Sequence, residues 1–363
     1  MTIMSLKVLA WPAFDPRTGN PYCSLLYHNL EDLSVQVDEF SYGHALLGKY
    51  DVLHLHWPER HLGSGTVKAL AGIHIVFACI LWAKIRRAKV IWTAHNLVSH
   101  GRRHPLLERY FWFVFTRLID GFISLSKDGC EHARMLFTGL RNRQGFVVPH
   151  GHYRGAIPAE MSTEKARELL GIPSECKVVL FFGRVSGYKN VPHLIRTFCQ
   201  STDEDWRLCV VGGLSSDVTM NDLAEAAGGD SRVSLRIGWV STEDIQMYYR
   251  SANLVVLPFR EISNSGSVLL TMSFNTPLLT VAQGALPELQ ESIGREWIRL
   301  YSDELELPHL TNAMDWARHE SRADRAPLTS FEWPLIARLT LNAYEAVVSK
   351  QTKDRECPCV PVA

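Results

Sequence analysis

The sequence predicts an α/β protein built from two doubly wound domains, and three observations support this fold class. Short runs rich in β-branched residues alternate with longer helical patterns, which is typical of parallel sheets covered by helices. These runs form one series before residue 150 and a second series after residue 176. The chain has 363 residues, 46% of them hydrophobic and 21% charged, so it is long enough to bury two cores.

Ten runs are predicted as strands, five in a domain of residues 1–155 and five in a domain of residues 170–325. The strands of the first domain are Lys7–Ala10, Asp51–His56, Lys89–Ala94, Gly121–Leu125 and Phe146–Pro149. The strands of the second domain are Lys177–Phe182, Arg207–Val211, Val233–Ile237, Asn253–Leu257 and Pro277–Val281. The polar stretch His150–Pro173, with a helical pattern at Thr163–Leu170, indicates the linker between the domains.

A further helical pattern follows the second domain. Pro334 begins it, and Ile336, Leu339, Ala343 and Val347 share one face, which predicts a helix within residues 331–349. Residues 350–363 carry charges, prolines and a Cys-Pro-Cys sequence, and we expect them to form a flexible tail.

Charge, cysteines and targeting signals narrow the class of protein. The 38 basic and 38 acidic residues balance, which argues against a nucleic-acid partner held by bulk electrostatics. Eight scattered cysteines without a C-x-x-C pair indicate reduced thiols in the cytosol. No secretory signal begins the sequence, and the most apolar stretch, Ala69–Ala83, is shorter than a membrane-spanning helix. We therefore expect a cytoplasmic protein with no segment that spans a bilayer.

The most specific motif lies in Val178–Phe198, where a buried strand is followed by G-R-x-x-x-x-K-N at a helix start. Gly183 permits a tight turn and close backbone approach, and Arg184 and Lys189 supply cations beside the helix that follows Asn190. Fixed cations next to unpaired N–H groups suit a diphosphate. The alternative is an ordinary strand–helix loop with two solvated cations, and the complete motif favours the diphosphate.

With this motif the chain resembles the GT-B fold glycosyltransferases, including those of bacterial polysaccharide assembly. Other segments resemble the same family: a cleft loop at Gly19 and Asn20, a strand-terminal His95, and a helix at Trp333–Val348 that crosses back to the first domain. The resemblance implies two Rossmann-like domains facing a cleft. It also implies a nucleotide-sugar donor on the second domain and an acceptor on the first.

One departure from the family pattern is informative. Many retaining members carry Glu-x7-Glu, but here Ile262 and Leu270 occupy those two positions. The chain instead offers small polar residues at a helix start, a pattern suited either to binding phosphate or to capping the helix. The donor-binding candidates in this loop are Glu261, Asn264, Ser265, Gly266 and Ser267.

With the sequence His54-Leu-His-Trp-Pro-Glu59, this loop most resembles the β-1,4-mannosyltransferases of xanthan-type exopolysaccharide synthesis, which are inverting and use GDP-mannose. The function expected is transfer of a sugar to a lipid-diphosphate-linked oligosaccharide. Three alternatives remain: a retaining enzyme that uses a UDP-sugar, a sugar-nucleotide epimerase or hydrolase on the same fold, and an inactive subunit that binds nucleotide or glycan.

Inverting transfer needs a base that removes a proton from the acceptor hydroxyl. The catalytic candidates, in order, are Glu59, Asp15 and His95, all close to strand ends of the first domain. His54 and His56 would share one face of a strand, yet no third metal ligand accompanies them. We therefore expect no metal site and no cofactor.

A membrane surface is the last partner that the sequence suggests. The apolar helical pattern at Thr66–Arg87 ends in cations, and the aromatic run Tyr110–Phe115 has arginines on both sides. This combination suits peripheral docking on the anionic inner leaflet, although a core helix with a basic end has the same pattern.

Overall fold

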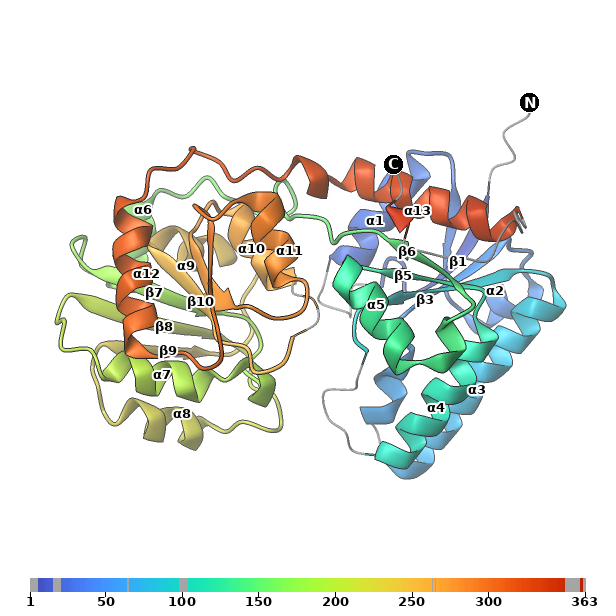
Figure 1. The fold of residues 1–363 in the computed structure, drawn as a ribbon, viewed down its shortest axis with the longest axis horizontal. Coiled ribbons are helices and arrows are strands. Elements are labelled where there is room, and N and C mark those ends of the chain that lie inside the picture. The colour runs from blue at the N-terminus through green and yellow to red at the C-terminus, as the bar shows by residue number, and fades with distance from the viewer. Residues whose placement is uncertain are drawn as a thin grey trace. The chain divides into compact units, whose positions relative to one another are not determined.

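The computed structural model describes residues 6–15, 21–63, 65–97, 104–262, 264 and 266–349, and the backbone of 360–361. The chain divides into two compact units (Figure 1). Unit 1 comprises residues 1–151 together with 330–363, and unit 2 comprises residues 152–329.

Unit 1 is built on a parallel sheet with strand order β13-β6-β5-β4-β3-β1-β2. The strands are β1 (Lys7–Trp11), β2 (Gln36–Glu39), β3 (Val52–His56), β4 (Lys89–Ala94), β5 (Gly121–Ser124), β6 (Gln144–Val147) and β13 (Val360–Pro361). The helices are α1 (Tyr22–Glu31), α2 (Tyr42–Leu47), α3 (Thr66–Ile85), α4 (Pro105–Leu118), α5 (Lys127–Leu136) and α13 (Trp333–Val348), with 3-10 turns η2 (Pro58–Gly63) and η3 (Thr138–Leu140).

Side chains alternate along each strand of this sheet, so both faces carry an apolar core. Val8 and Ala10 pack with α1 and α13 on one face, whereas Leu9 packs with α3 and α4 on the other. Strand β3 is buried at every residue, including its two histidines, His54 and His56. The C-terminal helix α13 packs against α1 and therefore belongs to the core of unit 1.

Unit 2 repeats this architecture with strand order β12-β11-β10-β7-β8-β9, again all parallel. Its strands are β7 (Lys177–Phe182), β8 (Trp206–Gly212), β9 (Val233–Ile237), β10 (Leu254–Leu257), β11 (Leu278–Val281) and β12 (Ile298–Tyr301). Its helices are α6 (Thr163–Leu170), α7 (Val191–Cys199), α8 (Met220–Ala227), α9 (Ile245–Ser251), α10 (Gly266–Ser273), α11 (Leu286–Ile293) and α12 (Leu307–His319), with 3-10 turns η4 (Gly187–Lys189) and η5 (Thr329–Phe331).

The predicted fold class, two doubly wound parallel α/β domains, is confirmed. In each sheet the strand order reverses once, between β1 and β3 in unit 1 and between β7 and β10 in unit 2. Ligands of open parallel sheets bind outside the carboxyl ends of the strands at such a reversal. The fold therefore marks one candidate site in each unit.

Several details differ from the sequence predictions. Strands β2 and β12 were not predicted, and each is a four-residue strand at or near a sheet edge. Residues 350–359 and 362–363 of the predicted flexible tail lie outside the described residues, but Val360–Pro361 pairs with β6. Cys130 is disulfide-bonded, which corrects the expectation of an entirely reduced set of thiols.

Among the described residues, α3 is the one helix long and apolar enough to cross a membrane. Its mean hydropathy reaches 1.8 over 18 residues, and a third of that window is buried. The buried face contributes Ile73, Val76 and Ile80 to the core of unit 1. The 20-residue helix is longer than the apolar stretch predicted from the sequence.

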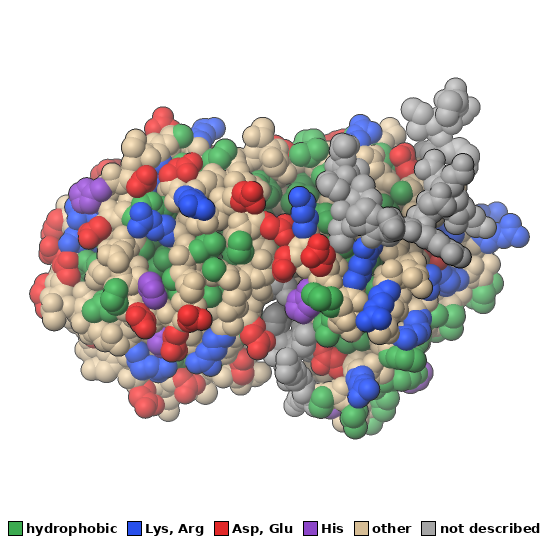
Figure 2. All heavy atoms as spheres, in the orientation of Figure 1, with side chains coloured by type: hydrophobic (Ala, Val, Ile, Leu, Met, Phe, Trp, Pro, Cys, Tyr) green, Lys and Arg blue, Asp and Glu red, His purple; other side chains and the backbone are tan. Residues whose placement is uncertain are grey.

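The outer faces of α3 and of α4, which packs beside it, are hydrophobic and basic. Exposed hydrophobic side chains on these helices are Val67, Leu70, Ile75, Leu81, Trp82, Ile85, Leu106, Tyr110 and Phe113. Exposed Lys68, Arg109 and Arg117 lie on the same two helices, whereas their one acidic residue, Glu108, is buried. Figure 2 shows basic and hydrophobic side chains together over this part of unit 1.

Candidate functional site

The candidate site of unit 2 begins where β7 ends. Gly183 has φ +134°, a conformation that L side chains rarely adopt, and leads the chain out of the sheet. Gly212, at the end of β8, has φ +137°, and a Cβ there would overlap the carbonyl oxygen of Gly183. Two glycines on adjacent strands thus allow the backbones to approach closely at this sheet edge.

Lys189 is the buried cation of this site. It ends η4, and Asn190 in the left-handed conformation (φ 55°) then begins α7. The Lys189 Nζ lies 3.0 Å from the point where a Cβ on Gly183 would stand, so the ammonium occupies space that only glycine leaves open. Burial, and secondly the Arg184 guanidinium, lower the pKa of Lys189 to about 8.

The loop after β10 completes this group of residues. The Arg260 N–H donates to the Tyr188 carbonyl at 2.8 Å, which ties this loop to the loop after β7. Helix α10 begins at Gly266, and the Ser267 Oγ lies 3.8 Å from the same Cβ position on Gly183. The structure therefore brings Gly183, Lys189 and Ser267 together at the reversal of strand order.

The other donor-binding candidates are placed less specifically. Arg184 and Glu261 are exposed, and Asn264 is partly buried just before α10. Ser265 lies outside the described residues. Among the residues that the structure describes, no carboxylate forms an ion pair with Arg184 or Lys189. The Arg184 guanidinium interacts electrostatically with Asp217, whereas buried Lys189 has no partner carboxylate among the described residues and is ready to bind an anion.

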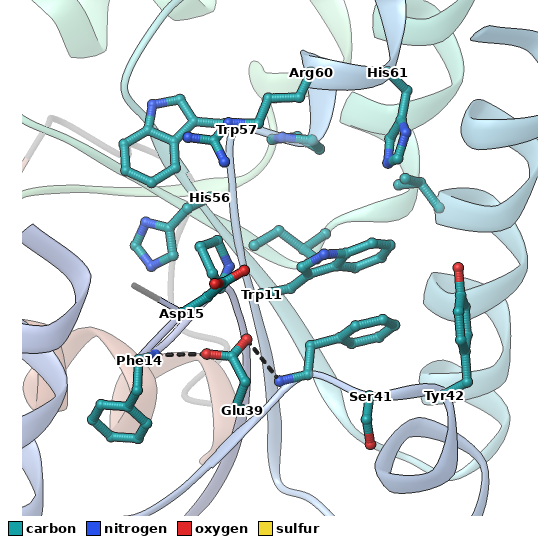
Figure 3. A pocket seen from close by; sticks show the side chains of 15 residues that line it. Trp11, Phe14, Asp15, Glu39, Ser41, Tyr42, His56, Trp57, Arg60 and His61 are labelled. Carbon is teal, nitrogen blue, oxygen red and sulfur yellow. Dashed lines mark hydrogen bonds between the residues drawn. The ribbon is translucent and has the colours of Figure 1, made fainter. Parts of the chain in front are cut away.

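The candidate site of unit 1 is a cavity of about 670 Å³ beside the carboxyl ends of β1 and β3 (Figure 3). Its aromatic wall includes Trp11, which stacks on Phe40 with ring centroids 3.8 Å apart. The Arg60 guanidinium lies 4.8 Å from the ring centroid of Trp57 and lines the same cavity. Aromatic rings beside a few polar groups are typical of small-molecule sites.

Two carboxylates line this cavity, and their situations differ (Figure 3). The Glu39 carboxylate accepts hydrogen bonds from the backbone N–H groups of Ala13 at 2.9 Å and Phe14 at 2.6 Å. Glu39 therefore holds the loop after β1 in place. Asp15, the second carboxylate, lines the cavity farther along that loop and is partly buried.

Glu59, the first choice for a base, does not line this cavity. It lies buried in η2, a 3-10 turn that contacts α3 and α4. Burial raises the pKa of Glu59 to about 7, although a hydrogen bond with Asn96 lowers it. Its Oε2 has no hydrogen-bond partner among the described residues. Of the two carboxylates predicted as bases, Asp15 is the one that the structure places at the cavity.

His95 follows β4 and is almost completely buried. Its ring stacks on Trp57 with centroids 4.1 Å apart, and its Nε2 lies 2.9 Å from the His56 Nδ1. His54 and His56 share one face of β3 as predicted, with ring centroids 4.2 Å apart. Burial keeps the pKa of His95 well below its usual value, so the imidazole is neutral at pH 7.

Gly19 and Asn20, the predicted cleft loop, lie outside the described residues. No group of three or more His, Cys, Asp or Glu residues in the described part of the chain has an arrangement that holds a metal ion.

Sequence reasoning found Asp15 but missed other residues that shape the cavity of unit 1. Trp11 and Glu39 line it, yet neither belongs to a motif. The one available signal was the short strand β2, which ends at Glu39 and was missed because its sequence, Gln-Val-Asp-Glu, has a single apolar residue.

Comparison with known proteins gives the family context. Residues 162–293, within unit 2, match the model of the family "Glycosyl transferases group 1". A GDP-mannose:glycolipid 4-beta-D-mannosyltransferase of Xanthomonas campestris pv. campestris is 29% identical over 91% of this chain and 89% of its own length.

Solved structures resemble the whole chain. Sucrose-phosphate synthase from Thermosynechococcus elongatus aligns with a TM-score of 0.69 and 16% identity over 95% of this chain and 99% of its own. HepE of Anabaena, solved with UDP and glucose, aligns with a TM-score of 0.60 and 16% identity over 95% of this chain and 100% of its own. At this level of identity the structures show the fold. Together with the matched family model and the relative of similar length, they show that the chain is a glycosyltransferase of the GT-B fold.

Proposed function

We propose that this glycosyltransferase moves mannose from GDP-mannose, with inversion, onto a lipid-diphosphate-linked oligosaccharide during bacterial exopolysaccharide assembly. The similarity to a GDP-mannose:glycolipid 4-beta-D-mannosyltransferase over 91% of this chain supports this choice of donor and acceptor. The absence of the Glu-x7-Glu pair favours it over a retaining enzyme, because Ile262 and Leu270 carry no carboxylate.

The observation that carries the proposal is the buried, unpaired Lys189 beside Arg184 at the sheet edge of unit 2. An ammonium that lacks an anionic partner in the described protein is best satisfied by a bound anion, and a nucleotide sugar supplies a diphosphate. The N-terminus of α10 and the Ser267 hydroxyl add donors to the same place. As the glycosidic bond breaks, these groups stabilise the charge that develops on the leaving diphosphate, and no metal is needed.

For unit 1 we assign acceptor binding to the cavity and the base to Asp15. In the transfer step, the acceptor hydroxyl loses its proton to the Asp15 carboxylate as its oxygen attacks the anomeric carbon. The bond from that carbon to the diphosphate oxygen breaks, and the diphosphate leaves with the electron pair. Aromatic side chains such as Trp11 and Trp57 give sugar rings an apolar surface on which to pack.

The chemistry is tested by nucleotide binding and turnover. Calorimetry with GDP, UDP, dTDP and ADP should show selective GDP binding that Arg184→Ala weakens. The matched control is Arg207→Ala, because Arg207 is also on unit 2 and its guanidinium donates to the backbone carbonyls of Glu204 and Trp206. Preference for UDP would replace the GDP-mannose assignment, and binding without turnover on a lipid-linked acceptor would indicate an inactive subunit.

The base is tested by two substitutions. Asp15→Asn should lower kcat by on the order of 10² or more, because the general base is lost. Glu59→Gln should leave kcat within a few-fold of the wild type. A large loss of kcat in Glu59→Gln together with a small loss in Asp15→Asn would identify Glu59 as the base instead.

We further assign α3 and α4 to peripheral contact with the anionic inner face of the plasma membrane. Their outer faces combine exposed hydrophobic side chains with cations, and their one acidic residue is buried. Flotation with vesicles that contain anionic lipid should recover the protein, and Leu106→Ser with Phe113→Ser should abolish recovery. Trp239→Ser removes an equally exposed hydrophobic residue of unit 2 and should change nothing. Equal recovery with neutral vesicles would contradict the electrostatic part of this assignment.

A further inference from the structure

A chain of buried polar side chains runs through unit 1 from the interior of the sheet to His95. The Thr93 Oγ1 lies 2.8 Å from the His54 Nε2, and the His54 Nδ1 lies 2.8 Å from the Tyr27 hydroxyl. The same hydroxyl lies 2.7 Å from the His56 Nε2, and the His56 Nδ1 lies 2.9 Å from the His95 Nε2. Four consecutive hydrogen bonds therefore connect three imidazoles, one phenol and one alcohol.

The members of this chain come from distant parts of the sequence. His54 and His56 stand on β3, Thr93 on β4, and Tyr27 on α1. Tyr344 of α13 adds a branch, because its hydroxyl lies 2.7 Å from the His54 Nδ1 and is also hydrogen-bonded to the Tyr27 hydroxyl. All of these side chains are buried, so each of their polar atoms needs a partner within the protein.

Every imidazole of the chain is neutral at pH 7. Burial lowers the pKa of His54 to about 3 and holds the pKa values of His56 and His95 well below the usual range. A neutral imidazole has one N–H donor and one acceptor nitrogen. Each imidazole therefore donates on one side and accepts on the other, so the position of its single proton sets the direction of both of its hydrogen bonds.

Thr93 decides the direction. Among the described residues, its hydroxyl has a single hydrogen-bond partner, the His54 Nε2. If the His54 Nε2 carried the proton, the Thr93 hydroxyl proton would be left without an acceptor in a buried position, which costs free energy. If Thr93 donates, the His54 Nδ1 carries the proton, and the Tyr344 hydroxyl must donate to the Tyr27 hydroxyl; every donor then has an acceptor. The His54 Nδ1–H then donates to the Tyr27 and Tyr344 hydroxyls. Because Tyr344 donates to Tyr27, the Tyr27 proton goes to the His56 Nε2, and the His56 Nδ1–H donates to the His95 Nε2.

We propose that this chain fixes His95 as the tautomer protonated on Nδ1, and so presents a neutral N–H donor at the carboxyl end of β4. Tyr27, His54 and His56 are positioning residues that act through His95. We take the acceptor of the His95 Nδ1–H to be an oxygen of the substrate, and this part of the proposal rests on the proposed function. The tautomer itself follows from the hydrogen bonds alone.

The tautomer is tested without any activity measurement. In protein labelled with ¹⁵N-histidine, the two nitrogens of His95 should give the shifts of a protonated Nδ1 and an unprotonated Nε2. Tyr27→Phe keeps the ring but breaks the chain between His54 and His56, so the His95 signals should change to those of mixed tautomers. A wild-type His95 protonated on Nε2, or signals unchanged in Tyr27→Phe, would overturn the proposal even if the protein proves inactive.

Kinetics then test whether the tautomer matters. Tyr27→Phe should lower kcat about tenfold and leave the KM values for donor and acceptor within about twofold of the wild type. The reason is that the reacting groups lose the N–H donor that the fixed tautomer of His95 supplies. Tyr344→Phe is the matched control, since it removes a hydroxyl from the branch and leaves the path to His95 intact. Urea unfolding should show similar stability for both variants.

A double-mutant cycle separates positioning from general disruption. His95→Asn places an amide N–H near the position of Nδ1, and this donor needs no hydrogen bond from His56. Adding Tyr27→Phe to His95→Asn should then cost less than twofold in kcat. A tenfold loss in both backgrounds would mean that Tyr27 acts on the fold and not through His95.

Discussion

Replacing Lys189 by methionine removes a buried charge and keeps most of the side-chain volume. The pKa of Lys189 falls from 10.5 to about 8 on folding, mainly because of burial. One pKa unit corresponds to ~1.4 kcal/mol, so at pH 7 the charged ammonium destabilises the free protein by about 3 kcal/mol. Lys189→Met should therefore raise the free energy of unfolding by up to about that amount in urea titrations at pH 7.

The pH dependence gives this prediction a sign that can be checked. Between pH 8 and 10.5 the unfolded chain binds the Lys189 proton and the folded protein does not, so the stability of the wild type rises with pH there. The advantage of Lys189→Met should shrink across this window and vanish above it. Lys177→Met is the control, because Lys177 stands at the opposite end of β7 in an ion pair with Asp203.

Nucleotide binding should reverse the burial effect. A diphosphate beside Lys189 restores the ammonium, so at pH 9 binding of GDP should take up about one proton. Calorimetry in two buffers of different ionisation enthalpy measures this uptake, and Lys189→Met should abolish it while lowering turnover by on the order of 10². Equal heats in both buffers, or unchanged GDP affinity in Lys189→Met, would refute the assignment of Lys189 to the diphosphate.

Three other substitutions test the remaining geometry. In the wild type, the free energy of unfolding should fall by up to about 3 kcal/mol as the pH rises from 4.5 to 7, because the unfolded chain releases a proton there that buried Glu59 retains. Glu59→Gln should remove this fall. Parallel pH profiles of unfolding for the two proteins would contradict the prediction. Gly212→Ala should lower the melting temperature, because its Cβ overlaps the Gly183 carbonyl, and an unchanged melting temperature would show that the two strands separate freely. Glu39→Ala should lower the free energy of unfolding by roughly 1–3 kcal/mol and raise the KM for the acceptor, because the backbone N–H of Phe14 loses its hydrogen-bond partner. A change in the KM for the donor alone would contradict the assignment of acceptor binding to this cavity.

The sequence by itself determined the order and type of most elements. Strands buried on both faces, such as β4 and β7, appear as continuous apolar runs, so Lys89–Ala94 and Lys177–Phe182 were predicted with the bounds that the structure has. The Gly183 turn and the cations that follow it were also visible, because a strand followed by glycine and a helix start is a local pattern. Short edge strands such as β2 escaped, since their few apolar residues leave no clear period.

Only the tertiary structure decided which polar groups meet. Glu59 and Asp15 looked alike as carboxylates after strands, but the turn η2 buries one and the loop after β1 brings the other to the cavity. The pairing of Tyr27 with His54 and His56 joins α1 to β3 across 27 and 29 residues, and Tyr344 reaches His54 across 290. Such contacts depend on the packing of helices against the sheet. Local sequence patterns record backbone preference and burial, and they carry no information about which distant side chain completes a hydrogen bond.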